Sequence, residues 1–582
     1  MPTISVEQSL LKSLLEKHGL THDIQQMDVQ LPLLGTDIDV CDESNLTIEI
    51  FPDRPDLLSG ETLAKAIRPF LHGCKSEPEL DVKQGDIKLT VDAELEHIRP
   101  IVLGAVVRGV PIQASEQEQD AFIKALMDHQ EKLHFALGRG RKRASIGVHD
   151  LAQIKPPFRV KAVPSSTSFC PLGMDKEMTI DEILSIHPKG VNFAHLLKDF
   201  SHYPIILDAD DKVLSFPPII NGKQTTVSKS TTDFFIDVTG WDRRACEASL
   251  MLVAIQLAER GGTIESVQVK SYDGETEHHP ISEPVKHQVT QRLLDGLLGR
   301  ALNDSEINSA INRMGGEYHG RQSARHFTSE TPDKMSDIVE GDFILTFAMP
   351  RWRFDILHPI DLVEEVAIGH GYEDLGVDVP KAPLTAIPRV DTQIRRRVRE
   401  SLQGLGFMQI QSLTLSNDFD QFEAMRWPEM GEVTRITNPI TIEHTLLRQY
   451  LLPGLFRLMA SNRHHDLPQS VYELGTVIRN HANNERFAFL TAEQGGGFAA
   501  IRGRIQALMR DLGATDYSIE PLSGKMGPWL TGRSAKVMIA GAHVGCFGEM
   551  DPSVCDQYEL QVPLNGAEFD IQALCSVLPD PV

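Results

Sequence analysis

A chain of 582 residues is too long to bury all of its apolar side chains in one core. Single hydrophobic cores stop growing at roughly 250–300 residues, so this length predicts roughly three to five domains. Hydrophobic residues make up 41% of the chain and charged residues 24%, and no low-complexity tract interrupts them. We therefore expect the chain to be globular throughout.

The charge balance is strongly acidic. Lysine and arginine total 57 against 81 aspartates and glutamates, which gives a formal net charge of −24. A nonspecific nucleic-acid binder carries a basic excess, so this class of protein is disfavoured. A local basic groove or a basic partner chain remains compatible with the composition.

The cysteines and the apolar runs indicate the compartment. Seven cysteines are scattered along the chain without a Cys-x-x-Cys pair. This pattern disfavours a disulfide framework or a zinc site and favours reduced thiols. The first twenty residues have an amphipathic helical pattern, and no apolar run approaches about 18 residues, so we expect no signal peptide and no membrane span. The prediction is a cytoplasmic protein.

Helical and strand-like patterns are mixed along the whole chain, which predicts an α+β multidomain protein. Predicted helices cover residues 5–19, 117–134 and 243–260, and another contains apolar positions 63, 67 and 71. Predicted strands include residues 46–50, 99–110, 203–208 and 343–350. Asn303 or Asp304 is the expected N-cap of a further helix. Three prolines within residues 379–393 predict a linker.

An acidic cluster lies in the stretch RWRFDILHPIDLVEEVAIGHG, residues 351–371. Its carboxylates are Asp355, Asp361, Glu364 and Glu365. Asp361 and Glu364 have the spacing of a helix N-cap and its capping-box partner, and Arg351 and Arg353 are placed to pair with the acids. The alternative is a Mg²⁺ site, because this ion prefers a few carboxylates and keeps several waters. Spacing alone leaves both interpretations open.

The same stretch has a faint echo near the N-terminus. PDRPDLLSGETLAKAI (residues 52–67) and PRWRFDILHPIDLVEEVAI (residues 350–368) share an arginine, an aspartate two residues later, and then a turn residue and a helical pattern. Two short copies are weak support by themselves. They suggest a duplicated small α/β unit.

A basic bunch interrupts the acidic chain in GRGRKRASIGVHD, residues 138–150. Its members are Arg139, Arg141, Lys142 and Arg143. Arginines both pair with phosphates and stack on bases, so one interpretation is an RNA-contacting patch. The other is a solvated loop or a set of ion pairs with a partner. His149 beside Asp150 is most simply a hydrogen-bonded structural histidine.

The segment from 213 to 242 gathers polar side chains around a turn fixed by two prolines and Asn-Gly. These side chains are Ser215, Asn221, Thr226, Asp237 and Thr239. Such groups suit hydrogen-bonded recognition of a small polar ligand. No Gly-x-Ser-x-Gly motif accompanies them, so any catalysis here is expected to use a positioned water.

Five segments in a fixed order carry a family resemblance. They are RPDLLSGETLAKAIRPFL, LGRGRKRASIGVHDL, FPPIINGKQT with FIDVTG, FDILHPIDLVEEVAIGHGY and NPITIEHTLLRQYLLPGL. Together the segments span nearly the whole chain, and in this order it resembles the β subunit of archaeal and eukaryotic-type phenylalanyl-tRNA synthetase.

The resemblance implies four domains. They are an N-terminal helix-strand module (1–85), a mixed α/β editing domain (86–275), a second helix-strand module with the acidic Mg²⁺ site (276–378), and a class II synthetase-like antiparallel sheet domain (390–582). The two modules are of a DNA-binding-like type, which accounts for the faint repeat. The last domain lacks the catalytic motifs of active class II enzymes, and the absence of a further anticodon-binding domain fits the archaeal type.

The resemblance also implies a function. The family forms cytoplasmic α₂β₂ heterotetramers in which the α subunit uses ATP to charge tRNA(Phe) with phenylalanine. The editing domain hydrolyses mischarged Tyr-tRNA(Phe), since a hydrogen-bonding second site can select a hydroxyl that an apolar pocket rejects poorly. An editing-inactive scaffold is the alternative. A DNA-binding regulator is disfavoured by the acidic balance, and no DNA or membrane partner is expected.

Residue roles carry over from the resemblance at matching positions. The implied editing pocket contains Ser215, Asp237, Thr239, Asn221 and Leu207, and Trp241 next to it is bulkier than expected. The implied Mg²⁺ ligands are Asp355, Asp361, Glu364 and Glu365, shared with the α subunit.

Overall fold

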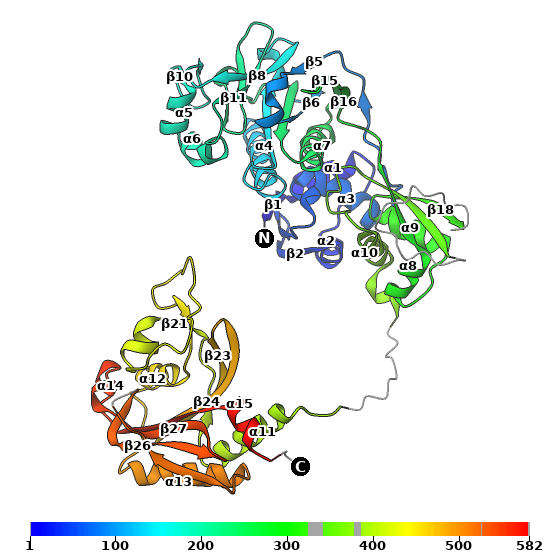
Figure 1. The fold of residues 1–582 in the computed structure, drawn as a ribbon. Coiled ribbons are helices and arrows are strands. Elements are labelled where there is room, and N and C mark those ends of the chain that lie inside the picture. Colours follow the sequence, from blue (N-terminus) through cyan, green and yellow to red (C-terminus); the bar gives the residue numbers. More distant parts are fainter. Residues whose placement is uncertain (1, 324–341, 377–385, 525–526, 580–582) are drawn as a thin grey trace. The chain divides into compact units, whose positions relative to one another are not determined.

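The computed structural model of the chain describes residues 2–323, 342–376, 386–524 and 527–579. The chain forms two units, Met1–Val379 and Pro380–Val582 (Figure 1). Helices and strands are mixed in both units, as the sequence predicts. Among the described residues, no helix combines the length and the apolar character needed to span a membrane.

The first unit begins with a small module of one sheet and three helices. Its elements are β1 (Thr3–Glu7), α1 (Gln8–Glu16), α2 (Ile24–Gln30), β2 (Thr36–Cys41), β3 (Asn45–Ile50) and α3 (Gly60–His72). The sheet order is β1-β3-β2 and both pairings are antiparallel. The helix predicted over 5–19 begins at Gln8, because residues 3–7 alternate exposed and buried side chains and pair with β3. The helix also ends at Glu16, three residues before the predicted end, so the prediction was wrong by three residues at each end.

A large mixed sheet forms the middle of the first unit. Its strands are β4 (Val82–Lys83), β5 (Lys88–Val91), β6 (Ile101–Arg108), β7 (Ala144–Asp150), β8 (Phe158–Pro164), β11 (His202–Leu207), β12 (Val213–Phe216), β13 (Ile220–Asn221), β14 (Phe234–Gly240), β15 (Thr263–Lys270) and β16 (Thr276–His279). The main order is β13-β12-β11-β8-β5-β15-β6-β14-β7, with β4 and β16 also pairing with β15. Beside it lie α5 (Ile180–Ile186), α6 (Pro188–Phe193) and the pair β9 (Ser168–Phe169) and β10 (Met178–Thr179).

Two helices cover this sheet near its β6-β14-β7 end. α7 (Arg243–Glu259) packs on β6, β7 and β14, and its residues 245–257 are all buried because they are mostly apolar all round. α4 (Glu116–Ala136) starts at a capping box between Ser115 and Glu118 and contacts β7 and α7. α7 also contacts α3 of the N-terminal module, so the middle sheet and that module share one core.

A second small module closes the first unit. Its elements are β17 (Val285–Thr290), α8 (Gln291–Leu298), α9 (Asp304–Arg313), β18 (Glu317–Ser323), β19 (Phe343–Met349) and α10 (Pro359–His370), with sheet order β17-β19-β18. Asn303 is the N-cap of α9, which confirms one of the two predicted caps. α9 packs closely on α10, since a Cβ at Gly369 would lie 2.0 Å from the Ala310 carbonyl oxygen. α9 also contacts α3, so the two helix-strand modules are neighbours.

The second unit contains one sheet with the order β20-β23-β24-β28-β27-β26-β25. Its strands are β20 (Met408–Gln409), β23 (Gln469–Arg479), β24 (Ala482–Ala492), β25 (Tyr517–Pro521), β26 (Trp529–Ile539), β27 (Ala542–Met550) and β28 (Leu564–Asp570), and the short pair β21 (Leu415–Ser416) and β22 (Leu446–Leu447) lies apart. Only the β20–β23 pairing of this sheet is parallel within the described residues. Its helices are α11 (Val390–Gly404), α12 (Leu452–Ser461), α13 (Phe498–Asp511), α14 (Pro552–Gln557) and α15 (Ile571–Val577). α11 begins inside the predicted linker 379–393, whose residues 379–385 lie outside the described part.

Candidate functional site

A cavity of about 490 Å³ lies in the middle domain and is lined by residues of α4, β7, β12, β13 and β14. This volume is within the range of small-molecule sites. Three of the five predicted pocket residues line it: Ser215, Asn221 and Asp237. They come from three strands, and the fold brings them together.

Asp237 lies on β14, a strand buried along its whole length between β6 and β7. Its direct neighbours across the two pairings are Gly104 and Gly147. A Cβ at Gly147 would lie 2.0 Å from Asp237 Oδ2, so a glycine there leaves the room that the carboxylate occupies. Asp237 itself is 1% exposed.

Ser215 and Asn221 are register partners in the β12–β13 pairing. The Asn221 Nδ2 donates to the Val148 carbonyl oxygen at 3.3 Å, which ties β13 to β7 across the cavity. Ser215 is buried among protein atoms yet lines the cavity. These two side chains therefore supply amide and hydroxyl groups to the cavity lining.

The other two predicted pocket residues are buried outside the cavity lining. Thr239 Oγ1 accepts a hydrogen bond from the Arg99 Nε at 2.7 Å and lies 3.0 Å from the Ser145 Oγ. Leu207 belongs to an apolar cluster behind β11. Trp241 is 48% exposed and does not line the cavity, so its bulk does not narrow the pocket.

The structure adds two residues that the sequence patterns do not reveal as parts of the site. His149 Nε2 lies 2.6 Å from Asp237 Oδ2, and His149 Nδ1 lies 2.8 Å from Thr225 Oγ1. His149 is fully buried and stacks on Phe235. The side chain is hydrogen-bonded, as expected, but its partner is Asp237, far along the chain, and not the adjacent Asp150. Only strand pairing joins positions 149 and 237, so no spacing rule in the sequence reveals this contact.

Arg141 departs from the predicted basic patch. It is 6% exposed, donates to the carbonyl oxygens of Pro218 and Ile219, and forms an ion pair with Glu131 at 2.8 Å. Burial lowers the pKa of Arg141. Arg141 lines the cavity and is not part of an exposed patch, and its predicted contact with RNA stays a prediction. The physical reason for its burial is a turn that directs residue 141 inward against the two prolines.

The other three members of the basic bunch are exposed. Arg139 and Lys142 have exposed side chains, and Arg143 lies 3.9 Å from Asp242 in a partly exposed pair. These residues remain available to an anionic partner. They lie on the same turn that carries Arg141, close to the cavity.

Glu131 on α4 lies at the cavity wall and collects several cations. It pairs with Arg141 and with Lys189 at 2.7 Å, and its Oε2 lies 3.5 Å from His134 Nδ1. The contact with His134, together with the two cations, lowers the pKa of Glu131. The pKa of His134 is lowered by burial. The cavity wall on this side is therefore a network of charged groups.

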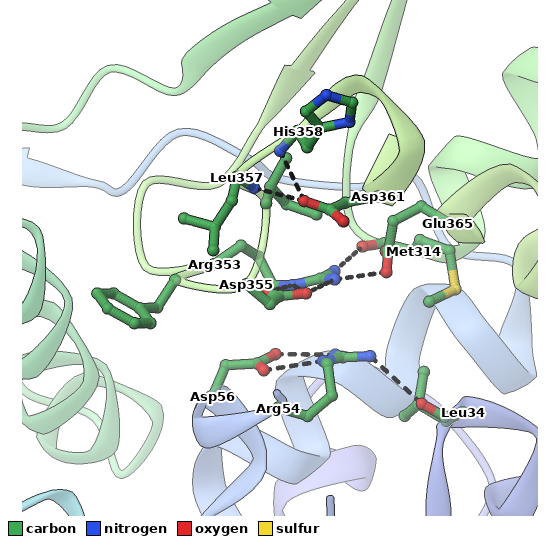
Figure 2. Close-up of polar contacts among 12 residues, drawn as sticks. Leu34, Arg54, Asp56, Met314, Arg353, Asp355, Leu357, His358, Asp361 and Glu365 are labelled. Atoms are coloured by element: carbon green, nitrogen blue, oxygen red, sulfur yellow. Dashed lines mark hydrogen bonds and ion pairs between the residues drawn. The ribbon is translucent and has the colours of Figure 1, made fainter. Parts of the chain in front are cut away.

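The acidic cluster of residues 355–365 is arranged around an arginine (Figure 2). Arg353 Nη2 lies 2.5 Å from Asp355 Oδ2 and 2.6 Å from Glu365 Oε1, and all three side chains are at least 89% buried. Arg353 thus pairs with the acids as predicted. Arg351 instead pairs with Glu247 at 3.2 Å.

Asp361 caps α10, but as the box partner of the N-cap residue and not as the N-cap itself. The N-cap of α10 is His358, and Asp361 is the box partner whose Oδ2 accepts from the backbone N–H groups of Leu357 and His358 at 2.7 Å each. The predicted capping box, with Asp361 as N-cap and Glu364 as box partner, was therefore wrong: the observed box lies three residues earlier in the chain. Pro359 suits the first helical position, so the helix begins earlier in the chain than predicted.

The earlier copy of the repeat has the same arrangement. Arg54 pairs with Asp56 at 2.8 Å, Ser59 is the N-cap of α3, and Thr62 is its box partner. Arg54 and Arg353 both line a cavity of about 300 Å³ between the two modules. Figure 2 shows the two arginine–aspartate pairs one above the other. The repeat in sequence is therefore matched by a repeat in local structure.

The four acids do not form one set of metal ligands in this structure. Asp355 and Glu365 neutralise Arg353, and one oxygen of Asp361 caps a helix. Glu364 is exposed, and partial desolvation of its carboxyl, with help from Asp53 and the other acids, raises its pKa. Within the described residues, no group of three or more His, Cys, Asp or Glu side chains is placed to hold a metal ion.

Comparison with protein families divides the chain into three matched segments. Residues 99–268 match the B3/4 domain, residues 288–372 the tRNA synthetase B5 domain, and residues 376–571 the CLM domain of the phenylalanyl tRNA synthetase beta chain. The cavity lies in the first segment and the acidic cluster in the second. The three domains define the class as an aminoacyl-tRNA synthetase component.

Relatives of known name extend this match over nearly the full chain. The chain is 38% identical to the phenylalanine--tRNA ligase beta subunit of Methanothrix thermoacetophila over 93% of this chain and 95% of the relative. It is 38% identical to that of Methanosarcina barkeri over 99% of both chains, and 37% identical to that of Archaeoglobus fulgidus over 94% of both. The chain belongs to the family of phenylalanine--tRNA ligase beta subunits.

A solved structure supports the fold of the first unit. The crystal structure of an N-terminal fragment of the phenylalanyl-tRNA synthetase beta subunit from Pyrococcus horikoshii covers 64% of this chain and all of the fragment. The TM-score is 0.55 and the sequence identity is 32%. The α+β multidomain character is thereby confirmed.

Proposed function

We propose that this chain, in a cytoplasmic α₂β₂ complex with a catalytic α subunit, proofreads tRNA(Phe) by hydrolysing mischarged Tyr-tRNA(Phe) in the cavity of the middle domain. The α subunit uses ATP to attach phenylalanine, and this chain supports that reaction and contacts the tRNA. The family membership supports the ligase complex. The proofreading assignment is the finer proposal.

The observation that carries the proposal is the convergence of Ser215, Asn221 and Asp237 on one cavity. A tyrosyl ester differs from a phenylalanyl ester by one hydroxyl. Buried polar groups discriminate strongly for such a hydroxyl, because they are left unpaired when it is missing. Asp237 Oδ1 has no hydrogen-bond partner among the described residues, and the Ser215 hydroxyl likewise has none there, so both are available to a substrate or a water.

The cavity walls fit a recognition role for the rest of the substrate. Apolar side chains of α4 and β13 alternate with the polar groups, as in ligand sites generally. The exposed Arg139, Lys142 and Arg143 lie on the turn next to Arg141 and are proposed to meet the tRNA backbone. Phosphate contacts of this kind position a nucleic acid without reading its sequence.

The test uses the full-length chain assembled with its α partner and Tyr-tRNA(Phe). We expect Asp237→Ala to reduce deacylation at least about 100-fold, the usual contribution of a positioned acid–base group. Charging with phenylalanine should remain intact. Asp233→Ala is the matched control, since Asp233 precedes the same strand and pairs with Arg108 on the surface. An unmutated assembly that does not deacylate Tyr-tRNA(Phe) would show that this subunit is an editing-inactive scaffold.

A Mg²⁺ ion at Asp355, Asp361, Glu364 and Glu365 stays a prediction. An ion that used all four would have to displace Arg353 from two of them. Titration of Mg²⁺ into assemblies carrying Asp361→Asn or Glu365→Gln tests the idea. Unchanged affinity in both variants would leave the acids with only their roles in ion pairing and helix capping.

A further inference from the structure

We propose that His149 and Thr225 are positioning residues for Asp237, and that His149 and Asp237 share one proton that fixes which carboxylate oxygen faces the substrate. The inference rests on the proposed hydrolysis of Tyr-tRNA(Phe) in this cavity. It concerns two residues, His149 and Thr225, that belong to no catalytic motif recognised in the sequence.

The hydrogen bonds of Thr225 determine the tautomer of His149. The Thr225 hydroxyl has one proton, and its Oγ1 lies 3.0 Å from the Gly222 carbonyl oxygen and 3.4 Å from that of Leu214. A carbonyl only accepts, so the hydroxyl donates its proton there and accepts from His149 Nδ1 at 2.8 Å. His149 therefore carries a proton on Nδ1.

The other ring nitrogen must then share a proton with Asp237. His149 Nε2 lies 2.6 Å from Asp237 Oδ2, a separation typical of a charge-assisted hydrogen bond. Without a proton between them, two acceptors would face each other in a site that is at least 98% buried. One proton thus lies between Nε2 and Oδ2, and the pair is neutral overall wherever along that bond the proton rests.

This arrangement selects Oδ1 as the free oxygen. Oδ2 is bonded to His149 and fills the space that a side chain at residue 147 would need, whereas Oδ1 has no partner among the described residues and Asp237 lines the cavity. One charged group, the buried Arg99, interacts electrostatically with Asp237. The Arg99 guanidinium also donates to Thr239, and on the α4 side the cations Arg141 and Lys189 are paired with Glu131.

The proposed step balances as an ester hydrolysis. Oδ1 of Asp237 accepts a proton from the attacking water while the water oxygen bonds to the ester carbonyl carbon. When the bond from that carbon to the ribose oxygen breaks, the leaving oxygen takes the proton from Oδ1. The products are the free amino acid, which loses its carboxyl proton to solvent, and uncharged tRNA. His149 keeps its proton on Nδ1, the shared proton stays between Nε2 and Oδ2, and His149 acts only through Asp237.

The experiment measures Tyr-tRNA(Phe) deacylation by the full complex across pH 5.5–9. We expect His149→Phe, which removes the donor to Asp237, to lower the rate at pH 7 about tenfold or more and to move the midpoint of the pH profile upward by roughly one unit, because an unpaired buried carboxylate holds its proton more strongly. His149→Gln restores an N–H at the Nε2 position and should recover most of the rate and the original midpoint.

A second matched pair tests the same idea without changing the histidine. Thr225→Val removes the acceptor for Nδ1–H at nearly constant volume, and Thr225→Ser keeps it. Thr225→Val should slow deacylation and shift the midpoint, and Thr225→Ser should not. If His149→Phe does not fold, this pair decides the question by itself.

Two outcomes overturn the inference. One is a uniform loss of rate with an unchanged pH midpoint in His149→Phe or Thr225→Val, which indicates a packing role. The other is full activity in both variants. Failure of the proposed function is distinguishable, because then the unmutated complex itself does not deacylate Tyr-tRNA(Phe).

Discussion

The ion cluster around Arg353 is expected to stabilise the junction between the two helix-strand modules. The Arg353 side chain is 2% exposed, and the side chains of its partners Asp355 and Glu365 are 11% and 5% exposed. Removing one member of a buried ion pair costs about 3–5 kcal/mol, because the remaining charges are left without compensation. Arg353→Met keeps most of the side-chain volume and removes the charge.

Two features of the structure set where in that range the loss should fall. Two acids lose their partner at once, which increases the cost. Arg54 lies near enough to repel Arg353, and loss of this repulsion in Arg353→Met offsets part of the lost stability. We therefore expect the free energy of unfolding of the first unit to fall by about 3 kcal/mol. Arg353→Met combined with Glu365→Gln should recover part of this loss, since one uncompensated charge is removed.

Urea unfolding of the full chain measures the effect. Trp352 is buried beside Arg353, and its fluorescence reports this unit when the other three tryptophans are replaced by phenylalanine. Lys155→Met is the matched control, because the Lys155–Asp210 pair is mostly exposed and a surface ion pair of this kind contributes little to stability. If Arg353→Met behaves like Lys155→Met, the buried cluster does not stabilise the module junction and the reasoning fails.

Three further predictions follow from single contacts. Burial lowers the pKa of His134, so the stability that this gives is present above the unfolded pKa near 6.5 and is lost as the pH falls below it. His134→Gln should therefore reduce the change in urea midpoint between pH 7 and pH 5. A variant whose midpoint changes with pH as much as that of the unmutated chain would contradict this. Asp361→Ala removes an acceptor for two backbone N–H groups and should cost about 1 kcal/mol in urea unfolding, more than Asp361→Asn does. Replacing the exposed Arg139 and Lys142 by alanine should weaken tRNA binding and flatten its salt dependence while the unfolding midpoint stays constant; an unchanged salt slope would remove these residues from the tRNA contact.

Elements with strong local signals are predictable from the sequence. The helices over 117–134 and 243–260 were located to within one or two residues, because apolar periodicity and caps such as Ser115 act locally. The start of α1 was not located correctly, because residues 3–7 pair with a distant strand in spite of their helical pattern. Local patterns cannot report a strand partner some forty residues away.

The candidate site shows the same division more sharply. The polar residues on β12, β13 and β14 were identifiable as a group because they lie within one segment. His149 was not assigned to the site, since its contact with Asp237 depends on the register between β7 and β14. The burial of Arg141 in the cavity lining was not foreseen, because charge composition does not show toward which side of a turn a side chain points. Long-range register and turn direction are what the sequence left undetermined.

The two copies of the Arg-x-Asp motif separate structural roles from the possible metal role. In each copy the aspartate follows the arginine by two residues, the N-cap follows by five, and the box partner by eight. Asp361 therefore stands where Thr62 stands in the first copy, and a residue without a charge performs the same capping there. Asp355 likewise corresponds to Asp56, which pairs with its own arginine. These two acids need no metal to explain them.

Glu364 and Glu365 have no acidic counterparts, since Lys65 and Ala66 occupy those places in the first copy. Glu365 has a partner in Arg353, although its Oε2 is buried without a hydrogen bond. Desolvation, together with the nearby acids Asp53, Asp361 and Asp355, raises the pKa of Glu364 despite the opposing effect of Arg353. A Mg²⁺ ion, if it binds this module, must therefore owe its affinity mainly to Glu364 and to whatever oxygen ligands a partner or solvent adds. Glu364→Gln is accordingly the substitution whose effect on Mg²⁺ titration is least confounded by lost ion pairs or caps.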